Sequence, residues 1–217
     1  MFYDQMSFLG GLPLYIIGAS CFDMIRNYYS SVYKSDKLGI NFAASNHALL
    51  SSSLSLLYLV MLKYFNYNYD SLGLIRFIIQ SISSSYFLYD SVVTIETQKG
   101  IMKYAYLYHH FCSIYILHLD FNIFPTVEGL FLAELSNLPS YVVYYLKKQV
   151  LVDKERLSNW RLIQNFLYGI IRIPLIGGYG GFYFYNNFSK KNLINYLIVS
   201  PVYLMGLVWT GKLLFKD

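Results

Sequence analysis

Seven apolar segments, each close to the length of a membrane span, recur along this chain. A helix needs about 20 predominantly apolar residues to cross the hydrocarbon core of a bilayer. The apolar runs 54–62 and 131–138 are continuous, whereas a half-buried strand would alternate apolar and polar residues. The pattern therefore predicts an all-α integral membrane protein with seven transmembrane helices. These helices are expected at Phe8 to Asp23, Ala43 to Phe65, Leu72 to Ile95, Tyr104 to Phe124, Val127 to Leu146, Leu162 to Tyr185 and Leu193 to Phe215.

The composition favours a membrane protein and excludes other classes. Hydrophobic residues make up 56% of the 217 residues and charged residues only 13%. That is too few charges to cover a water-soluble protein of this size. The two cysteines, Cys21 and Cys112, both lie inside apolar segments, so we expect neither a disulfide framework nor a cysteine-based zinc site. The histidines are too few and too scattered for a di-iron centre, and we expect no metal site and no bound cofactor.

The basic residues sort between the predicted loops and indicate an orientation. Twelve of the 17 Lys and Arg residues follow the first, third, fifth and seventh segments, three fall on the other side, and Arg76 and Arg172 lie within spans. Because cytoplasmic loops carry an excess of Lys and Arg, we expect a lumenal or external N-terminus and a cytosolic C-terminus. The basic residues form no stripe along one surface, so no nucleic-acid partner is expected.

Three of the predicted spans each carry a polar face. Charges in a bilayer are costly and usually face the interior of a bundle, so these faces are expected to meet. With the orientation above, His47, Asp90 and His109 fall in the cytosolic half, whereas Glu134 and Arg172 fall near the midplane. We therefore expect a polar cavity that opens toward the cytosol or the cytosolic leaflet, with Glu134 and Arg172 as an ion pair near its floor. The three faces comprise His47, Ser51, Ser55 and Tyr58; Ser83, Tyr86, Asp90 and Thr94; and Glu134, Asn137, Tyr141 and Tyr145.

The adjacent histidines of the fourth segment are the candidates for chemistry. His109 and His110 point about 100° apart on a helix, so at most one of them faces a cavity squarely. The other is then available to hydrogen-bond a neighbouring helix, as intramembrane polar groups often do. A chemical and a structural role for this pair are both open. His118 is on the opposite face from His109 and is expected to be structural.

An ordered set of short motifs resembles TLC-domain proteins, the group that includes ceramide synthases and TRAM proteins. The resemblance covers residues 35–217 and implies a six-helix TLC domain, formed by spans two to seven around an interior cavity. Residues 1–34 are then an added first helix with its cytosolic loop. It also implies the endoplasmic reticulum as the location. The motifs are Ser45-Asn-His47, Tyr86-Phe-Leu-Tyr-Asp90, Tyr108-His109-His110, Glu134-Leu-Ser136-Asn-Leu-Pro139, Tyr168 with Arg172, and Trp209 with Lys212.

The resemblance implies different chemistry for different branches of the family. In ceramide synthases the paired histidines take part in transferring an acyl chain from acyl-CoA to a sphingoid base. Here that pair would be His109 and His110, with Asp90 able to orient an imidazole. Ceramide synthases, however, carry a His followed by Asp-x-Ser-Asp where this chain has Ala133-Glu134-Leu-Ser136-Asn137. This form, with Pro139 after it, is closer to the non-synthase branch, whose roles include membrane-lipid composition.

Three functions follow as hypotheses. The favoured one is a protein that binds or handles a membrane lipid in an intramembrane cavity lined by His47, Tyr86, Glu134, Asn137 and Arg172, acting in membrane-lipid homeostasis. The second is an N-acyltransferase that uses acyl-CoA as co-substrate. The third is a seven-helix receptor, which the family resemblance opposes. A cytosolic mouth wide enough for CoA would favour the enzyme, whereas a cavity open sideways and closed to the cytosol would favour lipid binding.

Overall fold

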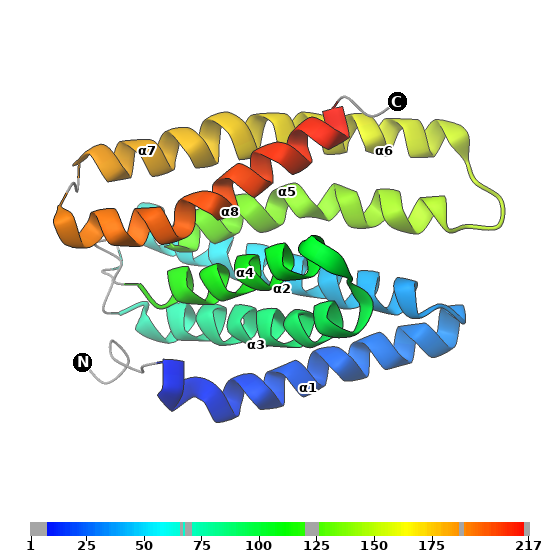
Figure 1. The fold of residues 1–217 in the computed structure, drawn as a ribbon, viewed down its shortest axis with the longest axis horizontal. Helices are drawn as coiled ribbons and strands as arrows, with labels where there is room; N and C mark the ends of the chain where they lie inside the picture. Colours follow the sequence, from blue (N-terminus) through cyan, green and yellow to red (C-terminus); the bar gives the residue numbers. More distant parts are fainter. Residues whose placement is uncertain (1–7, 66, 68–70, 120–125, 187–188, 215–217) are drawn as a thin grey trace.

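The described part of the chain is entirely helical. The computed structural model describes residues 8–65, 67, 71–119, 126–186 and 189–214. No strand is present in these ranges, which confirms the all-α fold. Three of the elements, α6, η1 and α7, follow one another without a break and form one long rod (Figure 1). The elements are α1 (Phe8–Tyr33), α2 (Asp36–Tyr64), α3 (Gly73–Thr97), α4 (Gly100–Leu117), α5 (Thr126–Lys147), α6 (Lys154–Leu167), the π-helix η1 (Tyr168–Ile176), α7 (Gly177–Asn186) and α8 (Lys190–Leu214).

Each apolar segment of the sequence corresponds to one helical rod, but three rods extend well beyond the segment. α1 continues to Tyr33, α2 begins at Asp36 and α6 begins at Lys154, all outside the apolar runs. Capping side chains stabilise the first turns of α2 and α6. The Ser35 hydroxyl accepts a hydrogen bond from the Leu38 amide, and the Asp153 carboxylate accepts one from the Arg156 amide. Part of the fourth predicted segment, residues 120–124, lies outside the described residues.

The rods run alternately up and down, so that α1 begins and α8 ends at opposite ends of the molecule (Figure 1). The turns α1–α2, α3–α4 and α5–α6 therefore lie at one end. We name this the basic end, after the residues at its turns, which are Lys34, Lys37, Lys99, Lys103, Lys147, Lys148 and Lys154. There Arg26 pairs with Asp36 at 2.8 Å and with Glu96 at 3.3 Å, which ties α1, α2 and α3 together.

The hydrophobic core lies between α1, α2, α3 and α5. Tyr58 of α2 and Ile79 of α3 are fully buried there, and Phe22 of α1 packs into the same cluster. α2 packs most extensively on α5 and α1. α1 is thus part of this core and packs along both α2 and α3. α8 runs diagonally across α4, η1 and α7 on the other side of the molecule (Figure 1).

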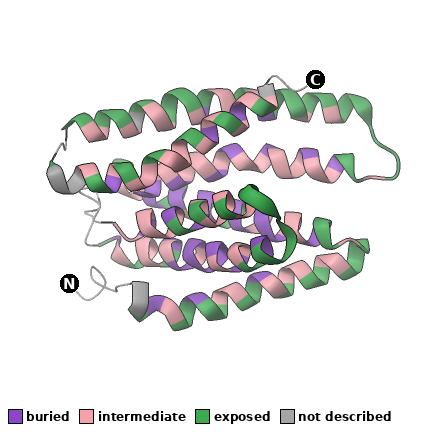
Figure 2. Ribbon diagram, in the orientation of Figure 1, coloured by how far each residue is buried: buried purple, intermediate pink, exposed green. Residues whose placement is uncertain are grey.

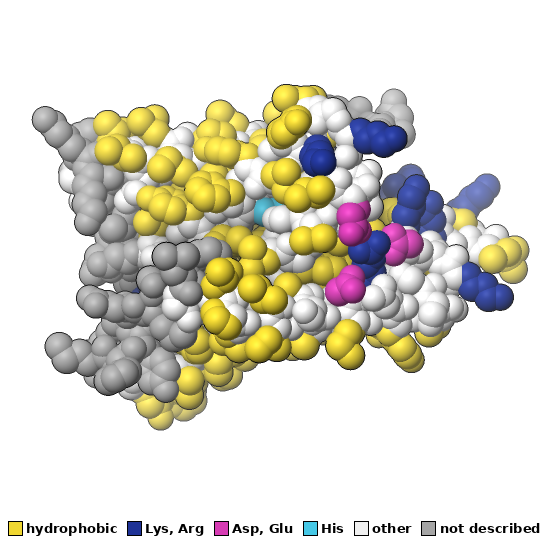
Figure 3. All heavy atoms as spheres, turned by 60° about the horizontal axis from the view of Figure 1, so that its bottom comes forward, with side chains coloured by type: hydrophobic (Ala, Val, Ile, Leu, Met, Phe, Trp, Pro, Cys, Tyr) yellow, Lys and Arg dark blue, Asp and Glu magenta, His cyan; other side chains and the backbone are white. Residues whose placement is uncertain are grey.

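Apolar side chains cover much of the outer surface. In Figure 2 the outer helices α1, α6 and α7 are mostly exposed or half-buried, yet their exposed residues include Ile17, Leu162 and Phe166, each more than 60% accessible. On the face shown in Figure 3, hydrophobic side chains spread over most of the described surface, and charged side chains gather at one end. Two helices, α2 and the Leu193–Leu213 part of α8, are long and apolar enough to cross a membrane. No other helix of the described residues passes that test of length and composition.

Candidate functional site

A cavity of about 600 Å³ lies between α4, α5, η1, α7 and α8. Its volume is in the range of small-molecule sites, roughly 300–1,000 Å³. The walls are mainly apolar, and the charged side chains, Asn137 and His109 lie toward one end. The lining residues are Phe87 of α3; His109, Ser113, Ile116 and Leu117 of α4; Thr126, Gly129, Leu130, Leu132, Ala133, Glu134 and Asn137 of α5; Tyr168, Arg172 and Ile176 of η1; Gly177, Gly180, Gly181 and Phe184 of α7; and Leu193, Tyr196, Leu197, Val199, Ser200, Val202, Tyr203, Gly206 and Trp209 of α8.

The charged and amide side chains lie toward the end of the cavity that is nearer the basic end of the molecule, which we name the polar end. On each of four rods, the lining residue closest to the basic end is polar or amphipathic: His109 on α4, Asn137 on α5, Tyr168 on η1 and Trp209 on α8. From there the cavity extends away from the basic end, past residues such as Leu130. The sequence analysis expected the cavity to open toward the cytosol or the cytosolic leaflet, and this stays a prediction.

Glu134 and Arg172 do not form the predicted ion pair. Asn137 lies between them, because its Nδ2 donates to Glu134 Oε2 at 3.2 Å while its Oδ1 accepts from Arg172 Nη2 at 2.8 Å. The amide occupies this position because Asn137 is three residues after Glu134 on the same helix, which places both side chains on one face. Tyr168 also donates to Asn137 Oδ1, at 2.7 Å. The cavity end is therefore a connected network of polar groups.

Arg172 is anchored on two of its three nitrogens. Its Nε donates to Ser136 Oγ at 2.9 Å, and its Nη2 donates to the Ala133 carbonyl at 3.1 Å as well as to Asn137. The guanidinium carbon lies 5.1 Å from the centre of the Tyr168 ring. η1 places these two side chains together, because a π-helix has wider turns than an α-helix and residues four apart align more closely. Tyr168, Arg172 and Ile176 accordingly all line the cavity.

His109 and His110 have different surroundings. His109 lines the cavity, packs edge-on against Trp209 at 5.7 Å, and has a buried Nδ1 without a hydrogen-bond partner. His110 lies outside the cavity lining and is paired on both ring nitrogens, with Asp90 Oδ2 2.9 Å from Nε2 and Ser91 Oγ 3.2 Å from Nδ1. One histidine thus faces the cavity and the other joins α4 to α3. Catalytic roles for His109, His110 and Asp90 stay predictions.

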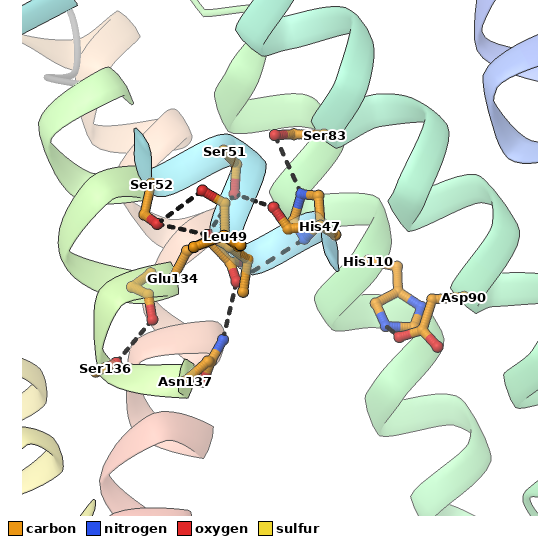
Figure 4. Close-up of polar contacts among 12 residues, drawn as sticks. His47, Leu49, Ser51, Ser52, Ser83, Asp90, His110, Glu134, Ser136 and Asn137 are labelled. Carbon is orange, nitrogen blue, oxygen red and sulfur yellow. Dashed lines mark hydrogen bonds and ion pairs between the residues drawn. The ribbon is translucent and has the colours of Figure 1, made fainter. Parts of the chain in front are cut away.

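His47 and Tyr86 do not line this cavity, contrary to the sequence analysis. Their rings stack at 4.0 Å between α2 and α3, and Phe22 of α1 packs edge-on against both. His47 is fully buried, with Nε2 3.3 Å from Ser83 Oγ and Nδ1 3.8 Å from Glu134 Oε2 (Figure 4). The polar faces of α2 and α3 meet each other and are closed by α1. Glu134 and Phe87, which packs edge-on against His47, connect them to the cavity.

The body of the cavity reaches the surface between α7 and α8. Among its lining residues, the exposed ones are Gly181, Leu197 and Ser200, all on these two helices. We name the gap at these three residues the α7–α8 portal. It lies toward the ends of α7 and α8 that are remote from the basic end. A Cβ atom added at Gly180 or at the buried Gly206 would meet nothing within 4 Å, which shows how these glycines widen the cavity.

Sequence reasoning missed several lining residues. Tyr168 and Trp209 entered only as parts of motifs, although the spacing of Tyr168 and Arg172 could have placed both on one face. The glycines of the segment 177–181 carried a further signal, since four of five residues there lack a side chain. His118, by contrast, bonds Ser84 Oγ at 3.2 Å and packs against Tyr15, which is the structural role expected for it.

Comparison with known proteins finds no family model, no curated protein and no solved structure that matches this chain.

Proposed function

We propose that this chain is a multi-pass membrane protein that binds a lipid in the cavity between α4, α5, η1, α7 and α8 and acts in membrane-lipid homeostasis. The observation that carries the proposal is the form of the cavity. It is apolar along its body, and its exposed lining residues are confined to the α7–α8 portal. A sideways opening of this kind suits a ligand that arrives from within a bilayer.

The membrane part of the proposal rests on where polar groups point. Helices α3 and α4 carry many polar residues, which lowers their mean hydropathy, but several of these residues pair inside the bundle. Gln80 donates to the Leu117 carbonyl, and Asp90 pairs with His110. The outer surface instead presents large apolar side chains such as Phe166 and Leu204. Water-soluble monomers rarely expose continuous apolar surfaces of this extent, whereas a bilayer favours them.

The family resemblance agrees with this proposal. TLC-domain proteins are expected to have a cavity inside a helical bundle, and the Glu134-Leu-Ser136-Asn-Leu-Pro139 form is closer to the non-synthase branch. We accordingly place the chain in the TLC family as part of the proposal, with seven spans, a lumenal N-terminus, a cytosolic C-terminus and the endoplasmic reticulum as its location.

The acyltransferase alternative rests on one feature, the unpartnered Nδ1 of His109 in the cavity wall. An activated nucleophile or base normally has an orienting partner, and the carboxylate of Asp90 is bound to His110 instead. We therefore expect the purified protein to transfer no acyl chain from acyl-CoA to a sphingoid base. Product that is lost in His109→Ala but retained in a folded His110→Phe variant would favour the enzyme.

Native mass spectrometry of the full chain, released from a mild detergent, tests the lipid proposal. The parent protein should carry about one co-purified lipid per chain. Gly206→Leu fills the cavity from a position where a Cβ meets no protein atom and should reduce lipid occupancy at least fivefold. Gly211→Leu is the matched control, because Gly211 lies on the same helix, also has open space at its Cβ and does not line the cavity. Equal occupancy in all three proteins would contradict the proposal.

A further inference from the structure

The polar end of the cavity holds an unused cationic donor. Arg172 donates through Nε and Nη2 to three protein oxygens, and Nη1 has no partner among the described residues. A guanidinium stays protonated and presents its N–H groups in a fixed fork. Its other contacts hold the side chain in place, so the two N–H groups of Nη1 are available at the cavity wall without further ordering of the residue.

A second polar atom without a partner lies in the α4 wall of the cavity. The Nδ1 atom of His109 is buried and has no hydrogen-bond partner, although buried ring nitrogens are normally paired. His109 is on α4 and Arg172 is on η1, and both line the polar end. With the proton on Nδ1, both residues donate. A ligand group with two acceptor oxygens can satisfy both donors at once, and a single hydroxyl cannot do so as well.

The charged side chains at the polar end of the cavity favour one class of acceptor group on a ligand. Arg172 is the only Lys or Arg, and Glu134 the only Asp or Glu, among the described residues that line the cavity. Glu134 accepts from Asn137 and lies beside His47, so it is engaged on the α2 side. A dianionic phosphate would bring two negative charges to a site with one guanidinium and one carboxylate, and an amine would bring a second cation toward Arg172. A carboxylate brings a single negative charge, which the guanidinium balances, and it pairs well with a guanidinium.

We infer that the ligand is a long-chain fatty acid whose carboxylate binds between Arg172 and His109. This inference rests on the proposed lipid-binding function. The hydrocarbon chain then lies along the apolar body, past Leu130 and Val202, toward the α7–α8 portal. The carboxylate is thus held at the closed end and the chain terminus is nearer the portal.

Binding of radiolabelled oleate to the purified full chain in nanodiscs tests this inference, with oleyl alcohol, sphingosine and lysophosphatidate as competitors. Oleate should bind best, and Arg172→Gln should weaken oleate at least tenfold, the size of a lost charge-assisted hydrogen bond. Binding of oleyl alcohol to Arg172→Gln should change less than threefold, which shows that the cavity is intact. Arg76→Gln is the control for removal of an arginine outside the cavity, where Nη2 donates to the Leu119 carbonyl.

The possible failures are distinguishable. Equal binding of oleate and oleyl alcohol, or oleate binding that is unchanged in a folded Arg172→Gln variant, would overturn the carboxylate inference and leave the lipid cavity standing. Preference for sphingosine or for lysophosphatidate would likewise overturn it and would identify an amine or a phosphate as the bound group. Failure of all four lipids to bind, together with no effect of Gly206→Leu on co-purified lipid, would defeat the proposed function itself.

Discussion

Two adjacent histidines of α4 illustrate how much one helical step changes the surroundings of a side chain. The sequence analysis predicted that at most one of them faces a cavity, which follows from the angle of about 100° between neighbouring residues. It could not predict which, because that depends on the rotation of α4 against α3 and α8. In the structure His109 meets Trp209 and the cavity, while His110 meets Asp90.

The pair of Asp90 and His110 should contribute to stability and not to lipid binding. Asp90→Ala leaves the buried Nε2 of His110 without its partner, and we expect it to cost about 1–3 kcal/mol in free energy of unfolding. A double-mutant cycle with His110→Phe, measured by denaturant unfolding in detergent, should give a coupling energy of about 0.5–3 kcal/mol. A coupling energy near zero, or loss of bound lipid in a folded Asp90→Ala variant, would contradict this assignment.

Residue spacing also explains the error over Glu134 and Arg172. Opposite charges near the same depth on two helices predict an ion pair, but Asn137 is on the same face as Glu134 and provides both a donor and an acceptor. Sequence alone orders these groups along each helix and does not give the distance between the helices. The bridging amide is therefore visible only in the structure.

The positions of the helices along the chain were easier to predict than the contacts between the helices. Each rod coincides with most of the described residues of the apolar segment assigned to it, because a long apolar run can bury its surface only as a helix in this composition. The extensions of α1, α2 and α6 were missed, since these added turns carry polar residues and are held by caps and by contacts such as Arg26 with Asp36. The packing of α1 into the core and the rotation of each helix come from tertiary contacts that periodicity does not contain.

The crossing of α1 and α2 depends on a glycine. A Cβ at Gly39 would collide with the Arg26 carbonyl of α1, which is backbone and cannot turn away, and with Ser30. Gly39→Ala should therefore lower the free energy of unfolding by about 1–3 kcal/mol. Gly180→Ala is the comparison, since its Cβ enters open space and removal of a helical glycine should raise stability by roughly 0.5–1 kcal/mol. Equal stability of the two variants in thermal unfolding would show that the helices are spaced differently.

The α7–α8 portal should control how fast the lipid exchanges. Ser200→Trp places a large ring at the exposed rim of the cavity, away from the polar end. We expect lipid exchange between nanodiscs, followed with a fluorescent lipid, to slow at least threefold while the amount of lipid bound at equilibrium changes little. Val208→Trp, on the exposed outer side of the same helix, should leave the exchange rate unchanged. Equal rates in both variants would show that lipid enters elsewhere.

For the whole molecule, the alternating rods place the two termini at opposite ends. If the rods span a membrane, tags at the two termini should then be on opposite sides of it. The basic end, with its seven lysines at the turns, should be cytosolic. In sealed microsomes we expect protease to remove a C-terminal tag and to spare an N-terminal tag until detergent is added. Removal of both tags without detergent, or release of the protein by alkaline carbonate, would be incompatible with seven spans.

Photocrosslinking tests the central claim, a lipid held inside the bundle, most directly. A phospholipid or fatty acid with a diazirine on its acyl chain is incorporated with the protein into nanodiscs. The nanodiscs are irradiated, and the adducts are mapped by peptide mass spectrometry. Leu130 is decisive because it lines the cavity and is only 8% exposed, so an adduct there has to form from inside. We expect adducts at Leu130 and at Val202 that disappear in Gly206→Leu, while labelling of the outward-facing Leu204 persists. Labelling at Leu204 alone in the parent protein would show that lipid surrounds the bundle without entering it, and would contradict the account.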